Sequence, residues 1–186
     1  MQIFGSEREK KLWQRVFFVL LAIYLSLGFA GGLVDYLEEK EILSIGFLVS
    51  FFLVIAAILA TAIKRKLAGI EIWLLIGIIG IYTVLIVRMG ISPVERTHLF
   101  EYSLLAILIK DALEERSDQL EMKFSPWLGA FFLSTILGCI DEGIQYFLPD
   151  RVFDLRDILF NTLAAFMALF AQYLMKGLRE RIQQSK

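Results

Sequence analysis

Ten polar residues in the second half of the chain have the types and spacing needed for acid–base chemistry or for binding an ionic group. Imidazole and carboxyl groups exchange protons when their surroundings tune them, and neighbouring amides orient them. The candidate catalytic residues are His98, Glu101, Asp141, Glu142, Gln145 and Asp157. A guanidinium fork holds phosphate or carboxylate, and further polar side chains complete such a site. The candidate ligand-binding residues are Arg96, Arg151, Asp154 and Asn161.

These residue types favour some kinds of chemistry and exclude others. His98 or Glu142 would serve as acid or base. Asp141, Asp157 and Asn161 would orient them or bind a divalent cation, and oxygen ligands with one histidine suit Mg²⁺, Mn²⁺ or Ca²⁺ better than Zn²⁺. The chain has one cysteine and one histidine, which excludes Cys-type zinc sites and multi-histidine metal cages. No nucleophile stands out, so metal-assisted or general acid–base chemistry is favoured.

Helical spacing gathers the polar residues into stripes. Three positions separate His98 from Glu101, and three separate Glu142 from Gln145, so each pair shares a helix face. The acidic and amide residues at the start of the last helix follow the spacing i, i+3, i+7, which is again one stripe. Gly138 lies one turn before the acidic pair, and alanines follow in the last helix. Small residues allow the two last helices to pack closely as an antiparallel pair, which would bring their stripes together.

The composition indicates whether the helices that carry these stripes lie in water or in a lipid bilayer. Of the 186 residues, 58% are hydrophobic and 21% charged, and the mean hydropathy is +0.66. A soluble domain is roughly 45–50% apolar, and this excess cannot be hidden inside a globule of such a size. The 19 basic and 20 acidic residues leave no excess positive charge, which argues against nucleic-acid binding. The lipid bilayer is therefore the expected environment.

Charge-free runs predict the membrane spans, because about 20 apolar residues cross a bilayer as a helix. Five runs are long enough, namely residues 16–34, 42–63, 72–87, 124–140 and 158–175. A sixth helix is predicted from Pro93 to about Leu113, where Ser92 and Glu95 form a capping box around the proline. The sequence therefore predicts an all-α, polytopic membrane helix bundle with six transmembrane helices, forming one domain over residues 1–186.

Loop charges predict which side each loop faces. With the amino terminus in the cytoplasm, fourteen Lys and Arg residues fall inside and five outside, and the bias agrees with the positive-inside rule at every loop. Both termini are then cytoplasmic. The ten candidate residues lie on the outer face, where ionisable groups near the membrane cost roughly 2.5–3.5 kcal/mol each and therefore need partners or a ligand.

The order of the polar residues resembles the pattern of the VanZ-like family of bacterial membrane proteins, over residues 90–174. The matching residues are Glu95, Arg96, His98, Asp141, Glu142, Gln145, Pro149, Arg151, Asp154, Asp157 and Asn161. Asp150 stands where the family often has glycine, and Ala164 and Ala165 replace a glycine-containing stretch. The resemblance implies a multi-pass protein of the bacterial plasma membrane, linked to low-level resistance to the glycopeptide teicoplanin. It implies no particular reaction.

Three functions remain in competition. The first is a site that binds or acts on a cell-envelope lipid or a lipid-linked headgroup. The second is a non-catalytic envelope protein that binds the glycopeptide or a precursor, or organises a partner, with its charges locked in ion pairs. In that case Asp154 and Asp157 would be a helix cap and a first-turn carboxylate. The third, a proton-coupled transporter, is weaker because the polar residues gather at one face and form no path through the midplane.

Overall fold

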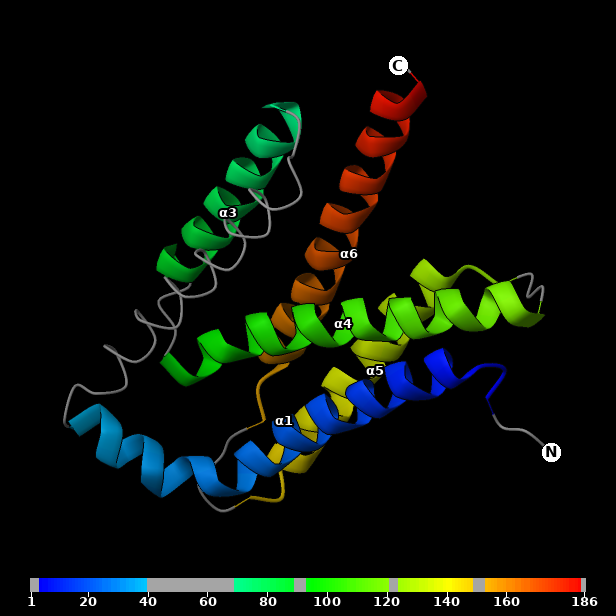
Figure 1. The fold of residues 1–186 in the computed structure, drawn as a ribbon. Helices are drawn as coiled ribbons and strands as arrows, with labels where there is room; N and C mark the ends of the chain where they lie inside the picture. Colours follow the sequence, from blue (N-terminus) through cyan, green and yellow to red (C-terminus); the bar gives the residue numbers. More distant parts are fainter. Residues whose placement is uncertain (1–3, 40–68, 89–92, 121–123, 149–152, 185–186) are drawn as a thin grey trace. The chain divides into compact units, whose positions relative to one another are not determined.

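Helices are the only regular secondary structure in the described part of the chain, which confirms the predicted all-α class (Figure 1). The computed structural model describes residues 4–39, 69–88, 93–120, 124–148 and 153–184. Within these ranges there are five helices and no strand. They are α1 (Glu7–Glu39), α3 (Gly69–Arg88), α4 (Pro93–Leu120), α5 (Pro126–Gln145) and α6 (Leu155–Gln184).

Helices occupy the predicted spans wherever these are described. The charge-free runs 16–34, 72–87 and 158–175 lie inside α1, α3 and α6, and the run 124–140 begins two residues before α5. The run 42–63, predicted as the second span, lies outside the described residues. Each helix continues into the charged residues beside its apolar run, because a helix satisfies its own backbone groups in lipid and in water alike.

The helices α1, α4 and α5 begin at residues that favour the start of a helix. Pro93 is the first residue of α4, as predicted, and Pro126 is the first residue of α5. Proline suits this position because the first helical N–H has no partner within the helix. Ser125, before α5, has extended backbone angles of φ −74° and ψ 116°. At the start of α1 the Ser6 hydroxyl accepts the backbone N–H of Glu9 at 3.0 Å, an N-cap bond.

The described residues fall into two compact units. The first contains residues 1–32 and 97–170, and the second contains residues 33–96 and 171–186. In the second unit, Arg179 Nε of α6 lies 2.9 Å from Glu71 Oε1 of α3. The Glu71 carboxylate is buried, so this ion pair supplies the opposite charge that a buried carboxylate requires. All the candidate site residues with described side chains lie in the first unit.

In the first unit α1, α4, α5 and the start of α6 pack side by side (Figure 1). Contacts between α1 and α4 show that these two helices are antiparallel, because Glu9 near the start of α1 meets Arg116 near the end of α4 at 3.1 Å. Ser103 of α4 donates to the carbonyl of Ala164 in α6 at 3.2 Å. Between these polar contacts the core is apolar, with Leu105 fully buried. A contact between His98 and Asp141 places the start of α4 beside the end of α5.

Two of the described helices, α5 and α6, are long and apolar enough to cross a membrane, and residues 69–84 of α3 form a shorter apolar helix. On α5 the exposed side chains include Leu128, Phe132 and Ile136, which follow one another at four-residue spacing. Such a stripe suits contact with lipid rather than with water. Six spans and cytoplasmic termini remain predictions.

Candidate functional site

The last turns of α5 bury three of the candidate residues. Asp141 and Glu142 are both fully buried, and Gln145 is 3% exposed. The positions i, i+1 and i+4 place Asp141 and Gln145 on one face of the helix, with Glu142 beside them. Two adjacent buried carboxyl groups are costly in any protein interior, so each needs its own hydrogen bonds, counter-charge or ligand. The structure gives the two groups different surroundings.

Glu142 joins the end of α5 to the start of α6. Its Oε1 accepts a hydrogen bond from Gln145 Nε2 at 3.0 Å, and its Oε2 accepts the backbone N–H of Asp154 at 3.2 Å. Asp154 in turn accepts the backbone N–H of Arg156 at 2.8 Å, which makes it the cap of α6. Both oxygens of Glu142 are therefore engaged, and the position of the α6 start depends on them.

Asp141 faces the histidine at the start of α4 instead. Asp141 Oδ2 lies 3.4 Å from His98 Nδ1, and Glu101 Oε2 lies 3.9 Å from the same nitrogen. His98 is 7% exposed. Neither oxygen of Asp141 has a hydrogen-bond partner among the described residues. The contact joins α4 to α5 and pairs the only imidazole of the chain with a fully buried carboxyl group.

Asn161 of α6 completes the contact of three helices. A Cβ atom built on Gly138 of α5 would lie 3.1 Å from Asn161 Cβ, so glycine is what allows the two helices to approach here. Asn161 is fully buried, and its amide nitrogen and oxygen have no hydrogen-bond partner in the described ranges. Asp157, one turn earlier and half-buried, lies close enough to act electrostatically on both His98 and Glu142.

Two tyrosines, which the sequence analysis does not include, border the site. The hydroxyl groups of Tyr24 in α1 and Tyr102 in α4 donate to the same carbonyl, that of Leu137, at 3.1 and 3.3 Å. The ring of Tyr102 stacks on the ring of His98, with centroids 6.3 Å apart and an angle of 11°. Tyr102 follows His98 by four residues, so helical spacing could have found it. Tyr24 lies within an apolar run and carries no such signal.

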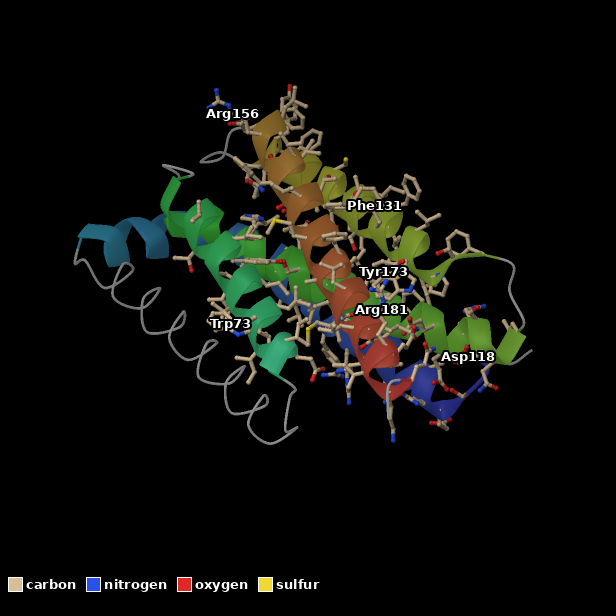
Figure 2. The ribbon with its side chains drawn as sticks, turned by 90° about the horizontal axis from the view of Figure 1, so that it is seen from above. Trp73, Asp118, Phe131, Arg156, Tyr173 and Arg181 are labelled. Carbon is tan, nitrogen blue, oxygen red and sulfur yellow. The ribbon has the colours of Figure 1, made fainter. Side chains whose placement is uncertain are left out.

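Several predicted residues are not placed in the site by the structure. The side chains of Glu95 and Arg96, and all of residues 149–152 including Arg151, lie outside the described residues. Arg156, which is not one of the ten candidates, lies at the start of α6, and its exposed side chain points away from the helices (Figure 2). Among the described residues no group of three His, Cys, Asp or Glu side chains is arranged to hold a metal ion.

The arrangement offers an acid–base pair in a buried polar cluster. Five buried polar atoms of His98, Asp141 and Asn161 make no hydrogen bond in the parts that the structure describes, although two of them, His98 Nδ1 and Asp141 Oδ2, face each other at 3.4 Å. Each such atom costs roughly 1–3 kcal/mol unless solvent or a ligand satisfies it, and charged groups cost more. Atoms of this kind mark the place where a polar group would bind. The carboxyl group of Asp141 also lies where it can orient the imidazole through Nδ1.

Comparison with known proteins identifies a family. A family model described as VanZ/LLP1 matches residues 8–176, about nine-tenths of the chain. The match includes every residue of the buried cluster and the contacting residues Tyr24 and Tyr102. Neither a search of the curated proteins nor a search of the solved structures finds a significant match.

Proposed function

Because this chain belongs to the VanZ/LLP1 family, we propose that it is a multi-pass protein of the bacterial plasma membrane that binds or acts on an envelope lipid. The site would lie at the outer face, and its ligand would be the headgroup of a cell-envelope lipid or of a lipid-linked precursor. The single observation that carries the proposal is the buried contact of His98 in α4 with Asp141 in α5, beside which Asn161 of α6 is buried close to Gly138.

The roles of the residues follow from their contacts. Asp141 would hold the His98 ring through Nδ1, which leaves Nε2 to accept or donate a proton at the ligand. Asn161 would donate and accept hydrogen bonds at the same ligand, because both polar atoms of its side chain are buried without a described hydrogen-bond partner. Glu142 would serve to position α6 rather than to exchange protons, since both of its oxygens accept hydrogen bonds.

A phosphate or carboxylate on the headgroup would need a cationic partner. Arg96 and Arg151 are the proposed partners, because each lies only a few residues from the cluster along the sequence and a guanidinium binds such groups with two parallel hydrogen bonds. By binding or acting on the headgroup, the site would change how much of it is available at the outer face, and teicoplanin susceptibility would change as a result. That connection is part of the proposal.

The test is teicoplanin susceptibility of cells that express the protein or its variants, with the abundance of each variant measured in the membrane fraction. We expect His98→Gln and Asp141→Asn each to abolish the protein's effect at normal abundance. Arg156→Ala is the matched control, because its side chain is exposed at the same end of α6 and it should leave the effect unchanged. Full activity of both site variants would refute the proposal.

A second candidate function rests on the hydrogen bonds of Glu142. Half of the buried cluster is satisfied internally, since Glu142 bonds to Gln145 and to the backbone of Asp154. A non-catalytic protein whose polar cluster only fixes the helices would have such a network. In that case every loss of function in the His98 and Asp141 variants would follow a loss of abundance.

A further inference from the structure

A polar pocket lies at the opposite end of the first unit, far from the His98 cluster along α1 and α4. Its volume is about 390 Å³. This is near the lower end of the roughly 300–1,000 Å³ typical of ligand sites. The pocket is lined by Arg8, Lys11, Leu12, Arg15, Asp111, Glu114, Glu115 and Asp118. All these residues belong to the start of α1 or to the end of α4.

The two walls of this pocket have opposite charge. The α1 wall is basic, and its residues Arg8, Lys11 and Arg15 lie at spacings of three and four, on one helix face. The α4 wall is acidic and ends near Asp118, which Figure 2 shows beside the start of α1. Opposite charges facing each other would normally close into direct ion pairs. Arg8 and Glu115 have done so across the pocket, whereas Asp111 and Glu114 pair with Lys110 of their own helix.

Ion pairs neutralise part of each wall. Arg8 Nε lies 3.3 Å from Glu115 Oε2. The ammonium of Lys110 lies 2.8 Å from Asp111 Oδ1 and 3.1 Å from Glu114 Oε2, so both carboxylates already have a cation.

Three charges of the lining then remain without an ion-pair partner among the described residues. They are Lys11, Arg15 and Asp118, two cations on one wall and one anion on the other.

A buried hydrogen-bond network holds the walls in place. Glu9 is 1% exposed and accepts the backbone N–H of Gly5 at 2.7 Å, the indole N–H of Trp13 at 3.2 Å and a guanidinium N–H of Arg116 at 3.1 Å. Ser6 also donates to Glu115 of α4 at 2.8 Å. Because these bonds fix the start of α1 on α4, the remaining charges are kept on opposite sides of the pocket.

We propose that this pocket binds a phosphoethanolamine headgroup, with its phosphate on Lys11 and Arg15 and its primary ammonium on Asp118. This step rests on the proposed membrane function: if the charge-free run of α1, which begins at Val16 directly after Arg15, is the first span, the pocket lies at the depth of lipid headgroups. A purely anionic headgroup would leave the Asp118 carboxylate facing like charge. A choline headgroup has no N–H to donate to that carboxylate.

Binding can be measured by native mass spectrometry of the full chain released from detergent, with lipids of matched acyl chains. We expect phosphatidylethanolamine to bind at least about fivefold more tightly than phosphatidylcholine or phosphatidylglycerol, the difference typical of one surface charge contact. Competition by soluble glycerophosphoethanolamine would show that the headgroup alone is recognised, and its failure would show that the lipid form is required. Either result supports the pocket. Equal binding of the three lipids, or preference for phosphatidylglycerol, overturns the proposal.

Variants separate this pocket from the rest of the basic surface. The double variant Lys11→Ala, Arg15→Ala should weaken phosphatidylethanolamine binding by about 25-fold, from two lost contacts of about fivefold each. Asp118→Asn should remove the preference for phosphatidylethanolamine over phosphatidylcholine. Lys10→Ala is the matched control, because Lys10 is exposed between the lining residues and pairs with Glu7 at 3.8 Å. An effect of Lys10→Ala equal to that of the double variant would show non-specific attraction and overturn the proposal.

Discussion

The close packing of Gly138 in α5 on Asn161 in α6 makes a quantitative prediction. A Cβ atom on residue 138 would lie 3.1 Å from Asn161 Cβ and 3.4 Å from Tyr102 Cε1. Both neighbours are fully buried and have little room to move. Overpacking of this kind costs about 1–3 kcal/mol. Alanine favours the helix by about 1 kcal/mol, so the net destabilisation expected for Gly138→Ala is up to about 2 kcal/mol.

Gly143 provides the matched control on the same helix. A Cβ atom there meets nothing within 4 Å, so Gly143→Ala has the propensity gain without the packing cost. The difference between the two variants isolates the packing term, which corresponds to roughly 2–12 °C in the midpoint of thermal unfolding for a chain of this size. The midpoints can be followed by tryptophan fluorescence in detergent micelles. Equal midpoints for the two variants would refute the close packing of α5 on α6.

Three further predictions concern single hydrogen-bonding groups. Glu9→Ala removes the acceptor of three donors, Arg116 among them, and should cost about 2–3 kcal/mol of stability in thermal unfolding; an unchanged midpoint would contradict the buried network. Glu142→Ala frees the backbone N–H of Asp154, so hydrogen exchange at that amide should become faster, and unchanged protection there would show that Glu142 does not hold the α6 start. Tyr24→Phe should cost only about 0.5–1.5 kcal/mol, because the Leu137 carbonyl keeps its other donors; a much larger loss would mean that the hydroxyl has another partner.

Periodicity and charge could predict the helices and the gathering of polar residues. The apolar runs locate the helices, although each helix continues into the charged residues beside its run, and Pro93 identifies the start of α4 directly. The i, i+3 spacing of His98 and Glu101 correctly indicates one helix face, and the 3.9 Å distance between their polar atoms agrees. The length of α4 was not predictable from apolarity alone. It continues past Leu113 to Leu120 as a charged helix, with Lys110 bonded to Glu114 one turn later.

Tertiary contacts decide what spacing alone could not. Asp141 and Glu142 are adjacent and chemically alike, so the sequence offers both as partners for an acid–base reaction. In the structure Asp141 faces His98, whereas Glu142 accepts a hydrogen bond from the start of α6. The two side chains differ because neighbouring helix positions are rotated by about 100° and because a different helix lies opposite each. The contribution of Tyr24 required knowing that α1 packs against α5, which no local pattern specifies.

The contact between His98 and Asp141 is the basis of the whole account, and the chain has no other histidine to confuse its detection. Nuclear magnetic resonance of isotope-labelled histidine in lipid bilayers therefore gives one imidazole signal. We predict that Asp141→Asn shifts the Nδ1 resonance of His98, because the carboxyl oxygen lies 3.4 Å from that nitrogen. Asp118→Asn, at the other end of α4, should leave it unchanged. An Nδ1 resonance that does not respond to Asp141→Asn would contradict the account.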